Sequence, residues 1–190
     1  MKCDVILSGV GGQGVLSVAA IIAQAAVDDG FAVRQSEVHG MAQRGGAVLA
    51  HLRLSDGVIS SDLVPRGEAD LVLSMEPMES LRHIEWLSPK GALVTAADPM
   101  VNIPNYPDLQ GILDAIKTLP KSRIVDAASL AKEAGLIKAV NMVMVGAASP
   151  FLPIKPETME KTIEKMFANK DAATIDANKK AYNFGKNAAK

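Results

Sequence analysis

A glycine-rich run near the N-terminus, Gly9-Val10-Gly11-Gly12-Gln13-Gly14, separates an apolar segment from a segment rich in Ala, Val and Ile. Glycine tolerates positive φ and lets a backbone approach a ligand closely. A helix that starts directly after such a run presents unpaired N–H groups and a partial positive charge. The run predicts a site for a phosphate, a pyrophosphate or a carboxylate. The alternative is that the glycines only let a strand turn tightly into a closely packed helix.

The same run satisfies the pattern G-x-G-x-x-G, which is typical of dinucleotide-binding proteins when an acid ends the second strand. Glu37 lies 23 residues after Gly14, at about the expected place. A stand-alone NAD(P)- or flavin-binding oxidoreductase is therefore a second hypothesis. Two features count against it. Glu37 opens a loop rich in Gly, Gln and Arg, and Gln13 is a bulky residue where a bare backbone cradle needs none.

Residues 36–46, Ser-Glu-Val-His-Gly-Met-Ala-Gln-Arg-Gly-Gly, place an acid, an imidazole, an amide and a guanidinium between glycines. Arg44 is suited to clamp a phosphate or a carboxylate through two parallel hydrogen bonds. His39 has the intrinsic pKa to titrate near neutrality. The alternative is an ion pair between Arg44 and Glu37 that braces the loop. So many polar groups in one loop indicate a binding site or an interface.

Other chemistries lack their residues. No G-x-S-x-G elbow and no P-loop Gly-Lys-Ser/Thr is present. The single cysteine, Cys3, excludes an internal disulfide, an all-cysteine zinc site and a self-contained iron–sulfur cluster. His39, His51 and His83 are too widely spaced to suggest a metal-ligand pair. We expect no metal or cofactor to be held by this chain alone.

The composition of the 190 residues is that of a globular protein, with 48% apolar and 22% charged residues. A net charge of −1 and few aromatic residues argue against binding to nucleic acid or to an anionic membrane. The longest apolar stretch, residues 15–27, is shorter than the roughly 20 residues that span a bilayer. These features predict no membrane and no nucleic-acid partner, and the single cysteine fits the reducing cytoplasm, so we expect a cytoplasmic protein.

Buried apolar runs alternate with helical patterns along the chain. We expect strands at residues 3–8, 31–36, 47–54, 58–60, 71–74, 92–95 and 123–126, and a turn at 88–91. We expect helices at residues 15–29, 76–86, 109–118, 127–134, 156–168 and 172–188. The pattern predicts the α/β class: a three-layer α/β/α sandwich with a Rossmann-like, mostly parallel sheet and C-terminal helices.

The chain is expected to form a single domain, 1–190, made of an α/β core at 1–150 and a C-terminal helical pair at 151–190. Charge differs between the two parts. Residues 1–150 carry 12 basic and 16 acidic groups, a net −4, and residues 151–190 carry 8 basic and 5 acidic, a net +3. The basic excess of the helical pair indicates a solvated surface or, as the alternative, a docking surface.

The glycine run, the small-residue helix after it and Arg44-Gly45-Gly46 before a strand together resemble the gamma-type subunit of 2-oxoacid:ferredoxin oxidoreductases. The fuller run at residues 36–46 looks most like the beta subunit of the indolepyruvate:ferredoxin oxidoreductases. The resemblance spans nearly the whole chain. It continues through Ala69-Asp70, Asn141 and Gly146-Ala147, and through Asn178, Ala181 and Gly185.

The resemblance implies a subunit of a complex that oxidatively decarboxylates aryl pyruvates, using coenzyme A and ferredoxin. It places thiamine diphosphate and iron–sulfur clusters in a large alpha subunit, which would be the partner of this chain. It supplies no catalytic residues for this chain. The residues expected to face that partner or a ligand are Gly9, Gly11, Gly12, Gln13, Gly14, Glu37, His39, Gln43, Arg44 and Gly45. The remaining alternative is an anion-binding interaction module with no link to redox chemistry.

Overall fold

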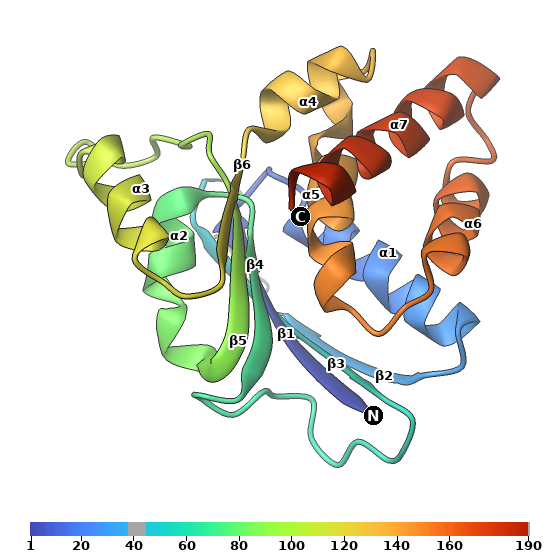
Figure 1. The fold of residues 1–190 in the computed structure, drawn as a ribbon, viewed down its shortest axis with the longest axis horizontal. Coiled ribbons are helices and arrows are strands. Elements are labelled where there is room, and N and C mark those ends of the chain that lie inside the picture. The colour runs from blue at the N-terminus through green and yellow to red at the C-terminus, as the bar shows by residue number, and fades with distance from the viewer. Residues whose placement is uncertain (38–44, 190) are drawn as a thin grey trace.

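Figure 1 presents the fold as a computed structural model, which describes residues 1–37 and 45–189. The strands are β1 (Lys2–Val10), β2 (Ala32–Glu37), β3 (Ala47–Ser55), β4 (Ala69–Ser74), β5 (Leu87–Ala96) and β6 (Ser122–Val125). The α-helices are α1 (Val15–Asp28), α2 (Pro77–Arg82), α3 (Leu109–Lys117), α4 (Ala127–Glu133), α5 (Val140–Ala148), α6 (Pro156–Met166) and α7 (Ala172–Ala188). Short 3-10 helices are η2 (Ile84–Trp86), η3 (Ile137–Ala139) and η4 (Ser149–Phe151).

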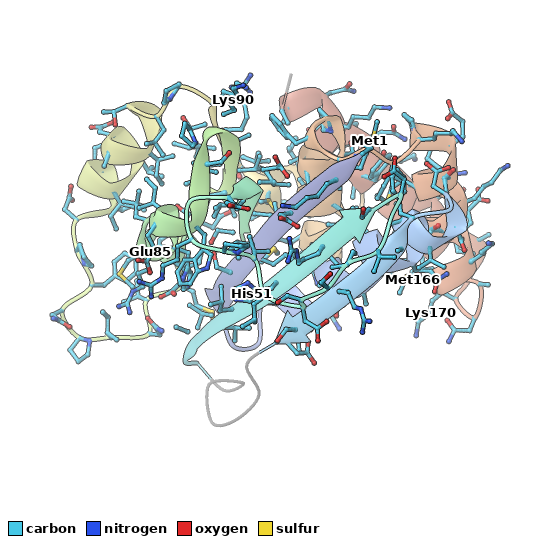
Figure 2. The ribbon with its side chains drawn as sticks, turned by 90° about the horizontal axis from the view of Figure 1, so that it is seen from below. Met1, His51, Glu85, Lys90, Met166 and Lys170 are labelled. Carbon is cyan, nitrogen blue, oxygen red and sulfur yellow. The ribbon has the colours of Figure 1, made fainter. Side chains whose placement is uncertain are left out.

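The strands form one sheet in the order β2-β3-β1-β4-β5-β6. β1, β4, β5 and β6 pair in parallel, whereas β3 pairs antiparallel with both β1 and β2. β3 alone runs against the other described strands, so the predicted mostly parallel sheet is confirmed. Figure 2 shows β3 lying between β1 and β2, which therefore do not touch each other.

Helices cover both faces of the sheet, which confirms the three-layer sandwich (Figure 1). α2 and α3 lie on one face, and α1, α5, α6 and α7 lie on the other. Alternation along β1 supplies both cores, because successive side chains of a strand point to opposite faces. Val5 and Leu7 belong to the larger core cluster, and Ile6 belongs to the smaller cluster with Val72 and Leu93.

The expected strand at residues 58–60 is wrong, because these residues are irregular. β3 already has β1 on one side and β2 on the other, so a hairpin partner after it has no free edge to pair with. The segment is held instead by the buried pair of Arg53 and Asp4. The Arg53 Nη1 donates to the carbonyl oxygens of Ser61 and Leu63, at 3.1 and 3.0 Å.

Two predicted boundaries around α2 and β5 also differ. The expected turn at residues 88–91 lies inside β5, where a register shift against β4 absorbs the extra residues. The expected helix at 76–86 ends as α2 at Arg82 and continues only as the 3-10 turn η2. The chain must leave the helix there because Leu87 already pairs with Ala69 of β4.

The two C-terminal helices pack against α1 and α5, on the face of the sheet that these helices cover. α6 docks on the end of α1, where Asp28 and Asp29 accept hydrogen bonds from α6 side chains. α7 crosses α5 through two glycines. A Cβ added at Gly146 would lie 1.9 Å from the Tyr182 carbonyl oxygen, and one added at Gly185 would lie 1.9 Å from that of Val143. Within residues 1–37 and 45–189, no helix is long and apolar enough to cross a bilayer.

Candidate functional site at the carboxyl edge of the sheet

The carboxyl ends of β1 and β4 lie side by side where the chain connections diverge. From β1 the chain passes to α1 on one face, and from β4 it passes to α2 on the opposite face. In open α/β sheets, such a switch point leaves a crevice outside the strand ends where ligands commonly bind. The glycine run is placed at this switch point, directly after β1.

The first turn of α1 follows the end of the glycine run and lies beside a cavity. Gly12 and Gly14 have φ values of 104° and 79°, in the region that favours glycine, and Gly14 is the N-cap of α1. Since glycine has no side chain, the N-cap itself supplies no acceptor for the first N–H groups of the helix. A cavity of about 300 Å³ lies here. It is lined by Val10, Gly11, Gly12, Gly14, Val15, Leu16 and Val48.

Gln13 points back into the protein and braces the switch point. Its Oε1 accepts a hydrogen bond from the Val10 N–H at 2.8 Å, and its Nε2 donates to the Met75 carbonyl oxygen at 3.0 Å. One side chain therefore joins the ends of β1 and β4. This contact explains why a bulky amide stands in a glycine run, and it gives Gln13 a structural role in shaping the site.

The structure brings Gly45 and Gly46 against the glycine run. The Gly11 N–H donates to the Gly46 carbonyl oxygen at 2.8 Å, and the Gly45 N–H donates to that of Gly11 at 3.1 Å. The side chain of Asn102 donates to the Gly45 carbonyl oxygen at 2.8 Å. Gly45 and Gly46, the last residues of the second motif, thus lie against the glycine run, which is about 30 residues away in the sequence. Because the Gly11 N–H donates in this contact, it is not available to a ligand in the cavity.

Glu37 does not stand where a dinucleotide site needs its acid. It ends β2 and pairs with Ala50 of β3, which in turn pairs with Leu7 of β1. A whole strand therefore separates Glu37 from the strand that carries the glycine run, whereas the dinucleotide fold pairs those two strands directly. Gln35 donates to Glu37 at 3.3 Å. His39, Gln43 and Arg44 lie outside the described residues, so their predicted roles stay predictions.

Glu76, which the sequence analysis overlooked, organises the same edge. Its side chain is fully buried, and it caps α2 by accepting a hydrogen bond from the Glu79 N–H at 2.8 Å. It also accepts from the Tyr106 hydroxyl and, at 3.4 Å, from the Met100 N–H. These bonds tie the irregular segment 97–108 to the end of β4. The available signal was an acid directly before Pro77 at the start of a helix.

Buried titratable groups lie below this edge, on the α2 face. Burial raises the pKa of the Glu79 carboxyl, and burial lowers the pKa values of His83 and His51. His83 and His51 both pack against the Trp86 ring.

Cys3 is also buried, which raises its thiol pKa to about 12, so it is a core residue with no thiolate character at neutral pH.

Within the described part of the chain, no three His, Cys, Asp or Glu side chains converge to hold a metal ion. Among the described residues, the edge offers mainly backbone groups, small residues and amides. The fold and the edge together define an α/β protein with a candidate ligand or docking site at the switch point of its sheet. The chain belongs to the pyruvate ferredoxin/flavodoxin oxidoreductase family, whose model matches residues 4–188.

Curated relatives match nearly the full length of the chain. The indolepyruvate oxidoreductase subunits IorB of Thermococcus kodakarensis and Pyrococcus horikoshii are 38% and 36% identical to it, over 98% of this chain and 96% of each relative. The 2-oxoglutarate synthase subunit KorC of Methanothermobacter marburgensis is 28% identical, over 77% of this chain and 76% of its own length. These relatives are subunits of oxoacid oxidoreductases, and the stand-alone dinucleotide enzyme is not supported.

Solved structures share the fold. The pyruvate oxidoreductase subunit PORC of Thermotoga maritima superposes with a TM-score of 0.73 and 27% identity, over 98% of this chain and 96% of that one. A 2-oxoglutarate:ferredoxin oxidoreductase of Magnetococcus marinus superposes with a TM-score of 0.78 at 21% identity. In that case 99% of this chain corresponds to 31% of a longer chain. The fold found here therefore also occurs as one part of a larger polypeptide.

Proposed function

We propose that this chain is the small subunit of an indolepyruvate:ferredoxin oxidoreductase, or of a closely related enzyme acting on aryl pyruvates. One observation carries the proposal: the IorB subunits match 98% of this chain over 96% of their own length. The KorC subunit matches a shorter part at lower identity. Because the IorB subunits and this chain match over nearly their whole lengths, we infer the same subunit in the same kind of assembly. A larger partner subunit would complete the enzyme.

The reaction proposed for the complex is an oxidative decarboxylation. An aryl pyruvate and the thiol of coenzyme A give an arylacetyl-CoA, carbon dioxide and a proton, and two electrons reduce ferredoxin. Thiamine diphosphate supplies the carbanion chemistry and iron–sulfur clusters carry the electrons, both in the partner subunit. One cysteine in the whole chain cannot supply the four thiolates of a cluster, which supports this division. A cytoplasmic location fits such an enzyme.

Within the complex, the carboxyl edge is proposed as the surface that faces the partner or the coenzyme A path. The hydrogen bonds among Gly11, Gly45 and Gly46 support this assignment, because they join the two motifs into one surface beside an open cavity. The described part of this surface is shaped by backbone and small residues, so a neighbouring chain or a ligand can come close to the backbone there. The isolated chain is expected to be inactive.

Reconstitution tests the proposal. The chain is mixed with its large partner, and ferredoxin reduction is followed with indolepyruvate, pyruvate and 2-oxoglutarate in the presence of coenzyme A. We expect activity only in the mixture, with indolepyruvate preferred. Arg44→Ala is expected to leave folding nearly intact and to weaken assembly or turnover. Turnover of indolepyruvate by the isolated chain would contradict the proposal. A reconstituted complex that does not reduce ferredoxin with aryl pyruvates would also contradict it.

A further inference from the structure

Residues 56–68 connect β3 to β4 without a helix or a strand, and we call this segment the strap (Figure 1). Its middle lies on β3, on the face of the sheet that carries α2 and the smaller core. Side chains alternate along β3, so Leu52 belongs to the larger core, whereas His51 and Arg53 contact the strap. Because the strap has no ladder of its own, such side-chain contacts decide whether it stays on the sheet.

The two side chains of β3 hold the strap in different ways. The Arg53 Nη1 donates to the carbonyl oxygens of Ser61 and Leu63, and the guanidinium keeps its charge at any ordinary pH. His51 accepts instead, because its Nδ1 takes the hydrogen bond of the Val64 N–H at 3.2 Å. The contact is buried, with His51 8% and Val64 3% exposed. An imidazole nitrogen accepts only while it carries no proton, so this contact requires a neutral ring with its proton on Nε2.

The charged groups around His51 favour the neutral ring. Each packed element contributes some of them: Arg34 from β2, Arg53 from β3, Asp4 from β1, Asp62 and Arg66 from the strap, Glu79 and Arg82 from α2, and His83 and Glu85 from the turn after α2. The Asp4 carboxylate pairs with Arg53 at 2.8 Å. The Glu85 carboxylate pairs with Arg66 at 3.1 Å. Burial and the charge of Arg53 lower the pKa of His51, so the closed strap disfavours a proton on this ring.

His83 differs from His51, although both rings pack against Trp86. Within the described part of the chain neither nitrogen of His83 has a hydrogen-bond partner, and its Nε2 lies 3.9 Å from the Glu79 Oε2. Burial lowers the pKa of His83 and raises the pKa of Glu79, so the carboxyl titrates with the opposite sign to the two histidines. Among the described contacts, only His51 joins a titrating ring to the strap by a hydrogen bond.

We propose that His51 is a pH-sensitive latch for the strap. The neutral ring holds the strap closed on β3. A proton on Nδ1 removes the acceptor of the Val64 N–H and sets two N–H groups against each other, which releases the strap at Val64 and uncovers part of the smaller core. Since the closed form favours the neutral ring, the latch is fully closed above about pH 6.5 and loosens as the pH falls. The inference does not rest on the proposed function.

Amide hydrogen exchange of the full-length chain, followed by NMR between pH 7.5 and 5.5, tests the latch. The protection factor of the Val64 amide should fall about tenfold over this range, because the open strap takes up a proton that the closed strap excludes. Ile6, in the middle of β1, should keep its protection. The nitrogen signals of the His51 ring should show the proton on Nε2 at pH 7.5. Constant protection of Val64, or a proton on Nδ1 at pH 7.5, would overturn the proposal.

Two asparagine variants assign the effect to one ring. In His51→Asn the side-chain oxygen can accept from the Val64 N–H and binds no proton in this range, so the protection of Val64 should no longer depend on pH. His83→Asn is the matched control, because it removes the other histidine beside Trp86 and leaves the latch intact. A tenfold fall that persists in His51→Asn, or that disappears in His83→Asn, would contradict the assignment. The ring tautomer and the His83 variant decide the question even where His51→Asn does not fold.

Discussion

Glycines stand at two places in this molecule for different physical reasons. At the crossing of α5 and α7, Gly146 and Gly185 have ordinary helical backbones but no room for a side chain. At the carboxyl edge, Gly12 and Gly45 have positive φ and nothing within 4 Å of an added Cβ. The first pair is required by packing, and the second pair is required by backbone conformation.

This difference separates what holds the fold from what is left open for function. A crossing where backbones touch stabilises the helical layer and offers no access. An edge where glycine leaves space beside open backbone groups is available to a ligand or a partner. Within the glycine run both reasons occur together. A Cβ at Gly14 would lie 2.3 Å from Asn141, whereas one at Gly12 would meet nothing.

The largest expected effect is at the helix crossing. In Gly185→Ala the new Cβ would lie 1.9 Å from the Val143 carbonyl oxygen, so α5 and α7 must separate. We expect a loss of about 3 kcal/mol in the free energy of unfolding, measured by chemical denaturation. Gly111→Ala is the control, because that glycine is also helical and its nearest neighbour lies at 3.5 Å. A similar stability for both variants would contradict the packing argument.

A smaller loss of stability is expected at the brace of the edge. Gln13→Ala removes the acceptor of the Val10 N–H and the donor to the Met75 carbonyl. We expect the free energy of unfolding to fall by about 2 kcal/mol, because partly buried backbone groups lose their partners. Gln24→Ala, which removes only an exposed hydrogen bond to Asp28, should change it little. Gln13→Ala with full stability would show that the strand ends do not need the bridge.

The backbone argument is tested by two glycines with matched conformations. Gly12→Ala and Gly30→Ala both introduce a Cβ at positive φ, 104° and 90°, with nothing within 4 Å. Each should destabilise the chain by about 1 kcal/mol. Gly30 lies past the far end of α1, so only Gly12→Ala should lower ferredoxin reduction by the reconstituted complex. Equal turnover of the two variants would mean that the open space at Gly12 has no role.

The sequence contained enough to predict the layers and the glycine run between the first strand and the first helix, but not the strand order. Apolar runs, and glycines where such runs end, predicted the positions of β1, α1 and α7, because local periodicity reflects burial. The insertion of β3 between β1 and β2 depends on long-range pairing that no local pattern carries. That one insertion separates Glu37 from the glycine run and makes the expected strand at 58–60 impossible.

The candidate site was predictable in part for a related reason. The clustering of glycines in the sequence is enough to predict Gly11, Gly12, Gly14 and Gly45 as site residues, and the structure brings them together. Gln13 drew attention by its type, yet its inward contacts depend on β4, which is about 60 residues away in the sequence. Glu76 had only the weak signal of an acid before Pro77, and Asn102 carries no motif. Their importance arises from tertiary contacts with Tyr106 and Gly45.

The smallest expected change in stability concerns Asn102, which links the segment 97–108 to the edge. Asn102→Ala removes its hydrogen bond to the Gly45 carbonyl oxygen, and we expect a loss of about 0.5–1 kcal/mol. Asn105→Ala, an exposed asparagine of the same segment, is the matched control. If the joined glycine motifs form the surface that meets the partner, Asn102→Ala should weaken assembly of the complex more than its small effect on stability explains. The Asn105 variant should assemble normally. Equal assembly of both variants, measured by titration with the large subunit, would restrict Asn102 to a structural role and would leave the glycine run without support from this segment.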